Sequence, residues 1–246
     1  MESSGQNRLH VDAIQVAYDD CVVLSELSLD LERGSLIGLI GPNGAGKTTL
    51  MLALSGQFRP RRGAIRFDGM DIYERNLAFK YRIGYVHEAP FFYPHLTAEE
   101  FLQFIARVKR VPSAELDLRV NRLLAQVCLN EERSKLTSEL SQGMKKKLAI
   151  AAALIGAPDL LFLDEALNGV DVESAYQIKE GLREFTTGGG TVLLSTHVLE
   201  VIEKLCDRYV VMKKGRIIDD VRAADWKETG QSSLEEYIIE RLRRLD

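Results

Sequence analysis

The sequence has few cysteines and no long apolar run. Its three cysteines, Cys21, Cys128 and Cys206, lie far apart and lack the spacing of a metal-binding motif. We expect them to be reduced core residues of a cytoplasmic protein. The apolar stretch 148–157 has about half the length that a bilayer-spanning helix needs, and Pro158 ends it. Any membrane role is therefore expected to require a separate partner.

Neither sign of charge is in large excess, because 32 Lys and Arg residues face 36 Asp and Glu residues, for a net charge of −4. Nonspecific binding to long nucleic acids depends on neutralising phosphates with Lys and Arg, so this balance disfavours that class. The first seven residues are polar and lack the apolar segment of a secretory signal peptide. At 246 residues the chain can bury a full core, as one large domain or one domain with a lobe.

A glycine-rich segment follows the apolar run 35–40, which predicts a buried strand, and precedes the run 50–54, which predicts a helix. Glycines let successive backbone N–H groups point inward around phosphate oxygens, and the helix N-terminus adds its free amides. Lys47 would bring a positive charge to the outer phosphates, and the Thr48 hydroxyl could coordinate magnesium. The Gly-x-x-x-x-Gly-Lys-Thr pattern thus predicts nucleotide binding by Gly41, Asn43, Gly44, Ala45, Gly46, Lys47, Thr48 and Thr49.

Alternating apolar segments between residues 9 and 31 predict an antiparallel hairpin before this loop. Tyr18 ends the first strand, where its ring could stack on a purine base or pack in the core. Further on, the range 88–156 predicts an all-helical lobe, in which Thr97 caps a helix to about Lys109. The aromatic run 91–93 at its entry is either ordinary core or an exposed patch for a partner.

The segment Leu140-Ser141-Gln142-Gly143-Met144 directly precedes a predicted helix, 145–155. Ser141 is a good N-cap, and Gly143 allows a close approach to the backbone. Three lysines then fall in the first turns of the helix, where their charges oppose the helix dipole. Either an anion docks at this end, or the lysines are solvated and tolerated.

Two carboxylates, Asp164 and Glu165, follow a predicted buried strand. Ligands of open α/β sheets collect at the carboxyl ends of the strands. Because neighbouring strand residues point to opposite faces, we expect one acid to serve magnesium and the other to act as a base on the substrate water. His197 follows the next buried strand, 191–195, and is placed there to bond a phosphate. A hairpin and a helix with an apolar face that includes Leu245 are expected in the range 207–246.

In this order and spacing, the motifs resemble the nucleotide-binding subunit of an ATP-binding cassette (ABC) transporter over nearly the whole chain. The resemblance implies an α/β fold in a single domain, 1–246, with a RecA-like P-loop core, an antiparallel β subdomain and an all-helical subdomain. The range 168–171 resembles the D-loop of the family. The range 140–144 resembles the family signature, which other P-loop ATPases and GTPases lack.

The resemblance also implies roles for single residues. Tyr18 would stack on adenine, and Asp164 would hold magnesium at the end of the Walker B strand. Glu165 would polarise the attacking water, and His197 would hold the γ-phosphate. Glu88 stands where the family usually has a glutamine, and its carboxylate can still coordinate magnesium.

The signature departs from the usual Ser-Gly-Gly-Gln at Gln142 and Met144, while Ser141 and Gly143 are retained. Similar signatures, and glutamates like Glu88, occur in exporter-type cassettes, so the resemblance favours export. It implies a head-to-tail homodimer in which ATP lies between Lys47 of one subunit and Ser141 of the other. Such a dimer would use ATP and Mg²⁺ to drive a separate membrane-spanning subunit, from the cytoplasmic face of the membrane.

Two other classes remain open. A soluble cassette ATPase that acts on nucleic acid or ribosomes usually has two cassettes or long coiled-coil insertions, and this sequence has neither. Nucleic acid is therefore not an expected partner. A regulatory ATP-sensing module is supported only by Glu88 and the altered signature.

Overall fold

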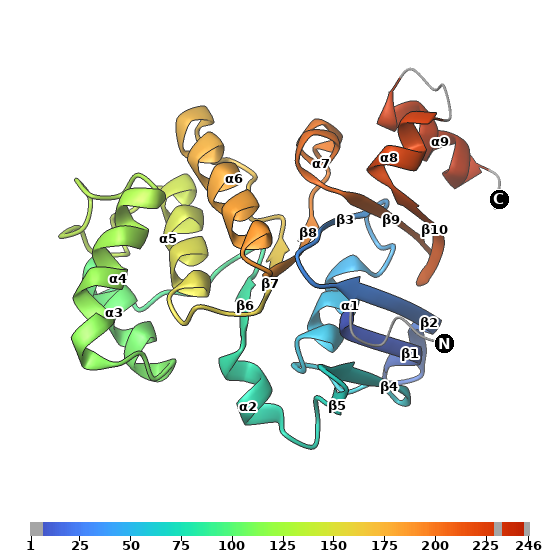
Figure 1. The fold of residues 1–246 in the computed structure, drawn as a ribbon, viewed down its shortest axis with the longest axis horizontal. Coiled ribbons are helices and arrows are strands. Elements are labelled where there is room, and N and C mark those ends of the chain that lie inside the picture. Colours follow the sequence, from blue (N-terminus) through green and yellow to red (C-terminus); the bar gives the residue numbers. More distant parts are fainter. Residues whose placement is uncertain (1–6, 229–232, 244–246) are drawn as a thin grey trace.

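The computed structural model describes residues 7–228 and 233–243 and has the predicted α/β architecture (Figure 1). Its strands form two sheets, a four-stranded sheet of order β2-β1-β4-β5 and a six-stranded sheet of order β10-β9-β3-β8-β7-β6. Helices of a separate lobe lie to one side of the larger sheet, and the smaller sheet lies on the other side (Figure 1). Leu245 and the first six residues lie outside the described residues.

The smaller sheet is antiparallel and begins with the predicted hairpin. In this hairpin Tyr18 lies opposite Cys21, next to the two-residue turn. Cys21 is exposed, so the prediction that every cysteine is a core residue is wrong for this position. Cys21 is the first residue of β2, directly after the turn of the hairpin. The strands of this sheet are β1 (Asn7–Tyr18), β2 (Cys21–Glu32), β4 (Arg62–Phe67) and β5 (Met70–Asp71).

The larger sheet is parallel except at one edge. Every residue of β3, β7 and β8 is buried, which explains why these strands are apolar throughout rather than alternating. The antiparallel edge strand β10 forms the predicted C-terminal hairpin with β9. The strands are β3 (Leu36–Ile40), β6 (Ile83–Val86), β7 (Leu160–Asp164), β8 (Thr191–Ser195), β9 (Arg208–Lys213) and β10 (Arg216–Arg222).

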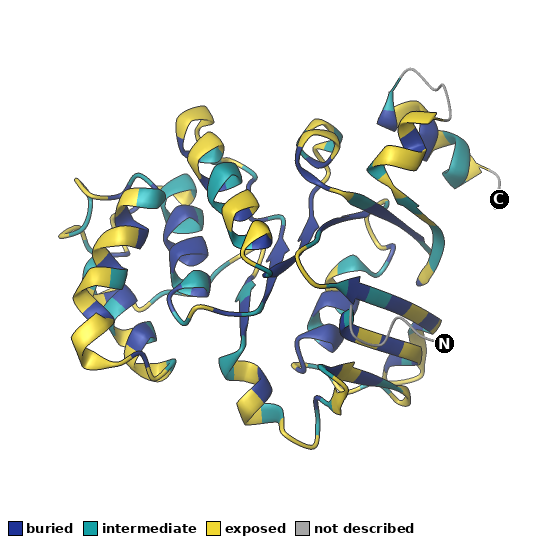
Figure 2. Ribbon diagram, viewed as in Figure 1, coloured by how far each residue is buried: buried dark blue, intermediate teal, exposed yellow. Residues whose placement is uncertain are grey.

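Successive residues of the parallel strands enter two different cores, as the two-residue period of a strand requires. Ile37 and Leu39 of β3 pack with helix α1 (Lys47–Leu54) and the antiparallel sheet. Leu36 packs on the opposite face, in the core that contains the helices of the separate lobe. Figure 2 shows the central strands as a continuous buried band between these layers. Helix α1 is thus fixed on one face of the sheet, directly after the loop that precedes it.

The helical lobe contains α3 (Ala98–Val108), α4 (Ser113–Gln126) and α5 (Gln142–Leu154). Thr97 forms the predicted capping box with Glu100 at the start of α3. Phe92 packs against Phe101 in the core, whereas Phe91 and Tyr93 are 78% and 46% exposed. Both interpretations of the aromatic run therefore hold in part: its middle residue is core and its outer residues form a surface patch.

Three short helices escape prediction from the sequence: α2 (Asn76–Tyr81), α7 (Leu199–Leu205) and α8 (Ala223–Glu228). Each spans two turns or fewer, too short for a helical period to stand out. The longer α9 (Leu234–Arg243) lies where a helix is predicted, and α6 (Val172–Thr187) directly follows the segment 168–171.

Candidate functional site

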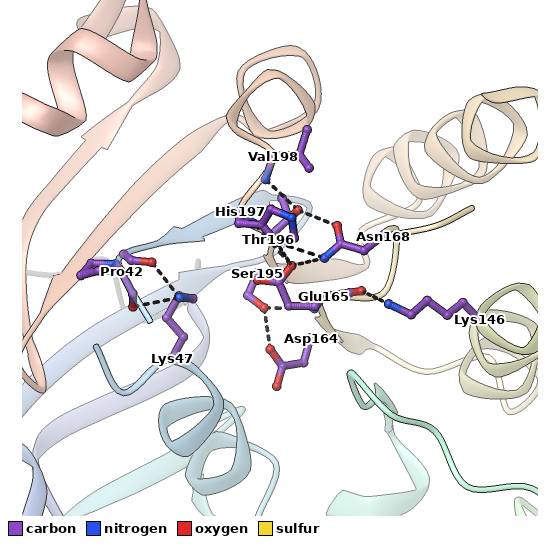
Figure 3. Close-up of polar contacts among 11 residues, drawn as sticks. Pro42, Lys47, Lys146, Asp164, Glu165, Asn168, Ser195, Thr196, His197 and Val198 are labelled. Carbon is purple, nitrogen blue, oxygen red and sulfur yellow. Dashed lines mark hydrogen bonds and ion pairs between the residues drawn. The ribbon is translucent and has the colours of Figure 1, made fainter. Parts of the chain in front are cut away.

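The loop between β3 and α1 is shaped by its glycines. Gly46 caps the helix with φ of 100°, a left-handed conformation that a side chain disfavours. The Nζ atom of Lys47 donates hydrogen bonds to the carbonyl oxygens of Gly41, at 2.7 Å, and Pro42, at 3.2 Å (Figure 3). Burial lowers the pKa of Lys47, and nearby carboxylates oppose that shift. The ammonium group is thus held over the loop, at the start of a helix.

A cavity of about 520 Å³ opens above this loop, within the size range of small-molecule sites. It brings together residues from five separate parts of the sequence, including most of those predicted to form the site. Its lining is Val23, Asn43, Gly44, Ala45, Gly46, Lys47, Thr48, Thr49, Glu88, Asp164, Glu165 and His197. The loop residues 43–49 and the carboxylates of Glu88, Asp164 and Glu165 therefore line one cavity.

Asp164 ends strand β7 and is almost fully buried. Its Oδ1 atom accepts a hydrogen bond of 2.6 Å from the Oγ atom of Ser195, at the end of β8. The same Oγ atom and the carbonyl oxygen of Ser195 accept from the backbone N–H of Glu165, at 3.2 and 3.1 Å. Ser195 therefore fixes both acids, a role that the sequence does not reveal because the two strands are far apart along the chain.

Glu165 lies beyond the end of the strand and has φ of 49°, in the left-handed region. The rule that neighbouring strand residues point to opposite faces therefore does not apply to it. Both Asp164 and Glu165 line the cavity, so the expectation that they face opposite ways is wrong. Their surroundings still differ, since Asp164 bonds a buried hydroxyl and Glu165 bonds an amide and an imidazole.

The Glu165 carboxylate belongs to a cluster with Asn168 and His197 (Figure 3). Its Oε2 atom accepts a short hydrogen bond from Nδ2 of Asn168 and lies 3.1 Å from Nδ1 of His197. The Nδ2 atom of Asn168 also lies 3.2 Å from the same imidazole nitrogen. The Glu165 side chain is 14% exposed and that of His197 is 71% exposed, so the imidazole stands at the cavity mouth. Asn168 was predicted as part of a turn, without this role for its side chain.

The lysines at the start of α5 have partners within the chain. Nζ of Lys146 donates to the carbonyl oxygen of Glu165 at 2.7 Å (Figure 3). Nζ of Lys147 donates to Oγ of Ser174 at 2.8 Å and pairs with Asp171 at 3.4 Å. For these two residues neither predicted alternative is right, because they are neither solvated nor free to meet an external anion.

Ser141, Gly143 and Tyr18 lie outside the cavity lining. The exposed Ser141 caps α5, where its Oγ accepts from the N–H of Met144 at 3.2 Å. A Cβ atom on Gly143 would lie 2.6 Å from the carbonyl oxygen of Gly169, so only glycine fits this contact with the 168–171 turn. The predicted signature residues are thus held near the carboxylate end of the site but do not face their own phosphate loop.

Tyr18 ends β1 with 42% of its surface exposed. Its ring packs against Phe58, with 4.8 Å between the ring centroids. The hydroxyl of Tyr73 donates to the carbonyl oxygen of Phe58 at 2.7 Å, and Arg61 donates to the carbonyl oxygen of Asp19. The segment 58–61, to which the sequence assigns no site, therefore supports the turn that presents Tyr18.

Three of the residues that line the cavity offer oxygen ligands to a cation: Thr48 has a hydroxyl, and Asp164 and Glu88 have carboxylates. Over residues 7–228 and 233–243, no three His, Cys, Asp or Glu side chains are grouped to hold a metal. In proteins, Mg²⁺ is typically coordinated by one or two carboxylates, and substrate phosphates complete its coordination. These residues therefore fit a magnesium ion that arrives with a nucleotide.

Comparison with known proteins places these features in a family. Residues 24–168 match the family model for the ABC transporter. The Nod factor export ATP-binding protein I of Cupriavidus pinatubonensis is 36% identical over 88% of this chain and 67% of its own length. The SkfA peptide export ATP-binding protein SkfE of Bacillus subtilis is 30% identical over 91% of this chain and 92% of its own. Among seven other curated relatives, that from C. pinatubonensis included, the chain spans 55% to 73% of their length.

Solved structures agree with the sequence comparison. A structure of the ATP-binding subunit of an ABC transporter superposes with a TM-score of 0.89 at 32% identity, over 95% of this chain and 99% of the other. CbiO1 of Clostridium perfringens, part of the ABC transporter complex CbiONQ, gives a TM-score of 0.80 at 28% identity, over 98% of this chain and 97% of the other. The predicted RecA-like fold, with its antiparallel and helical parts, is confirmed. In the part of the chain described, no helix is long and apolar enough to cross a bilayer.

The phosphate loop, the paired acids and the signature helix thus occur together in a chain that matches transporter ATP-binding subunits over nearly its whole length. This protein belongs to the ABC transporter family and is an ATP-binding cassette of that family.

Proposed function

We propose that this chain binds and hydrolyses ATP to power an exporter, as a peripheral subunit at the cytoplasmic face of a membrane. The observation that carries the proposal is the single cavity that joins a phosphate loop to Asp164, Glu165 and His197. Relatives named for export of a Nod factor and of a peptide support the direction of transport. The soluble alternative, acting on nucleic acid or ribosomes, gains no support from these relatives.

The cavity residues divide the work of hydrolysis. Lys47 and the loop amides neutralise charge on the outer phosphates, which is most of what phosphoryl transfer requires. The Glu165 carboxylate takes a proton from the attacking water. The oxygen of that water bonds to the γ-phosphorus while the bond between the γ-phosphorus and the bridging oxygen of the β-phosphate breaks, and ADP leaves with the electrons of that bond. Asn168 and His197 contact that carboxylate, and His197 would hold the γ-phosphate.

Thr48, Asp164 and Glu88 would hold Mg²⁺, which supplies charge neutralisation at the phosphates when bound. Tyr18, supported by Phe58, would stack on the adenine ring. The remaining nucleotide contacts in our proposal come from the loop residues Gly41, Asn43, Gly44, Ala45, Gly46 and Thr49.

The second half of the site comes from another subunit, most simply a second copy of this chain. Ser141 and Gly143 lie outside the chain's own cavity, and Ser141 is exposed at the start of α5. A helix N-terminus with free amides is suited to a phosphate group. In a head-to-tail pair, this end of α5 would meet the γ-phosphate bound on the loop of the partner.

The membrane-spanning subunit would dock on an apolar groove of about 480 Å³ between β6 and the helical lobe. The groove is lined by Phe91, His87 and Ile105, among others, and the exposed ring of Tyr93 extends the aromatic surface beside it. Exposed aromatic side chains are enriched at protein interfaces. Movement of the lobe after hydrolysis would reach the membrane subunit through this groove.

The test replaces Glu165 by Gln, which keeps the shape of the side chain but cannot accept the proton. We expect ATP binding to persist while turnover falls by roughly 100-fold or more, the scale of a lost catalytic base. With ATP and magnesium, the variant is expected to elute from a sizing column as a dimer. A variant that hydrolyses ATP at the rate of the unaltered protein would refute the assigned role of Glu165, and a persistent monomer would count against the shared site.

A further inference from the structure

The main chain at Glu165 is held in an unusual conformation. Its φ of 49° lies in the left-handed region, which a non-glycine residue occupies at a cost that its surroundings must offset. The N–H group of Glu165 donates to Ser195 on one side. Its carbonyl oxygen accepts from the backbone N–H of Asn168, at 3.4 Å, on the other. This second hydrogen bond is long, so it does little to hold the carbonyl by itself.

The short hydrogen bond to this carbonyl comes from a different element. Nζ of Lys146 lies 2.7 Å from it, at the distance of a charge-assisted hydrogen bond. Lys146 lies on α5, which begins at the Ser141 cap, and its side chain is partly buried on its way to the end of β7 (Figure 3). Ordering a lysine side chain in this way costs conformational entropy. The hydrogen bond to the Glu165 carbonyl must offset that cost, so it stabilises the backbone conformation at Glu165.

We propose that Lys146 is a positioning residue for ATP hydrolysis: by binding the carbonyl oxygen of Glu165, it holds the left-handed turn that directs the Glu165 carboxylate toward His197 in the cavity. The proposal rests on the role proposed above for Glu165. Lys146 touches neither the reacting water nor the phosphates in this scheme and acts only through that turn.

The same contact joins two halves of the proposed dimer site. Ser141 and Lys146 lie five residues apart on one rigid helix, a rise of about 7.5 Å. A shift of α5 when Ser141 meets the nucleotide of the partner would therefore move Lys146 and the Glu165 carbonyl together. The next residue, Lys147, forms an ion pair with Asp171, so α5 also contacts the end of the segment 168–171.

The test compares Lys146→Met, which keeps the apolar stem but loses the donor, with Lys146→Arg, which keeps a charged donor. Lys145→Met serves as the comparator, because it removes the same charge one residue away. For the full chain, we expect Lys146→Met to lower kcat by on the order of tenfold while KM for ATP stays within about twofold, as for a group that acts only in the transition state. Lys146→Arg is expected to recover most of that loss.

A second measurement does not depend on turnover. Hydrogen–deuterium exchange of the peptide that covers 164–171 in the nucleotide-free protein should quicken in Lys146→Met and stay unchanged in Lys145→Met. If the unaltered chain proved unable to split ATP, the proposed function would fail, while faster exchange would still support the link between Lys146 and the turn. Should Lys146→Met fold poorly in thermal unfolding, Lys146→Leu, which also lacks the donor, takes its place in both measurements.

Four results would overturn the proposal. The first three are an unchanged kcat in Lys146→Met, a loss of kcat that Lys146→Arg does not recover, and equal exchange of the 164–171 peptide with and without the lysine. A loss equal to that of Lys145→Met would also overturn it, because it would reflect the charge of the helix alone.

Discussion

The two sides of the nucleotide cavity are built differently. On the side of the phosphate loop, the lining residues 43–49 are consecutive in the sequence and include Gly44 and Gly46. On the opposite side, the lining residues follow the ends of β7 and β8 and are held by hydrogen bonds from Ser195, Asn168 and Lys146. The first side is therefore a local structure, and the second depends on residues brought together by the fold.

This difference suggests a division of labour. Backbone amides around a phosphate bind the nucleotide in its ground state, and their geometry changes little when a neighbouring side chain is replaced. The side-chain network orients the general base, so its loss should reduce turnover more than binding. Substitutions on each side can confirm or break this comparison.

The largest effect is expected on the loop side. Lys47→Ala removes the only full charge that the loop segment 41–49 brings to the phosphates, so ATP binding should weaken and hydrolysis should fall by roughly 100-fold or more. Isothermal titration with ATP and a phosphate-release assay measure the two effects. Lys227→Ala, on the exposed surface of α8, is the control for loss of one charge. Undiminished turnover in Lys47→Ala would discredit the site.

A smaller effect is expected for Ser195→Ala on the carboxylate side. It removes the hydroxyl bonded to Asp164, a hydrogen bond to a charged group worth about 1.5–3 kcal/mol. If about half of that is lost from the transition state, turnover falls roughly tenfold, while KM for ATP changes little. Thr191→Val removes a buried hydroxyl from the opposite end of the same strand, and should lower stability without this loss of turnover. Equal turnover of the two variants would contradict the proposed role of Ser195.

A smaller effect is expected where Tyr18 is proposed to stack on the adenine base. Phe58→Ala removes the ring behind Tyr18, so affinity for ATP should fall about five- to tenfold, at the lower end of the range for one base–aromatic contact. Binding of inorganic triphosphate should be unchanged, because the phosphate loop is untouched. An equal loss for both ligands would indicate that Phe58 supports the loop instead of the base.

The smallest effect concerns acid stability. The N–H and hydroxyl of Ser174 and then Lys147 lower the pKa of Asp171 from 3.8 to about 2. A carboxyl whose pKa is depressed in the folded state stabilises it above the unfolded pKa, and this contribution is lost as the pH falls from about 4 to about 2. Asp171→Asn can still cap α6 through its oxygen but carries no charge, so its unfolding midpoint in urea should vary less over that window. If the urea midpoint changed with pH to the same extent in Asp171→Asn and in the unaltered protein, this result would argue against the ion pair with Lys147.

Much of this structure could be predicted from the sequence, and the reasons differ by region. The phosphate loop, the paired acids and the capped helices α3 and α5 are specified by residues close together in the chain. The roles of Ser195, Asn168 and Lys146 depend on contacts across 30, 3 and 19 positions, respectively, to Glu165 or its backbone. Even the short-range contact of Asn168 depends on the left-handed turn at Glu165, which no glycine marks.

The groove proposed to receive the membrane subunit and the phosphate cavity meet at one peptide bond. His87 lines the groove, and its neighbour Glu88 lines the cavity, so consecutive side chains serve the two proposed ligands. A partner that moves His87 also moves Glu88, because the two residues are adjacent in the chain and no contacts through the protein interior are needed. By thermodynamic linkage the influence must run both ways and by the same factor. A cassette arranged in this way would sense an occupied transporter through the affinity of its own magnesium–nucleotide complex.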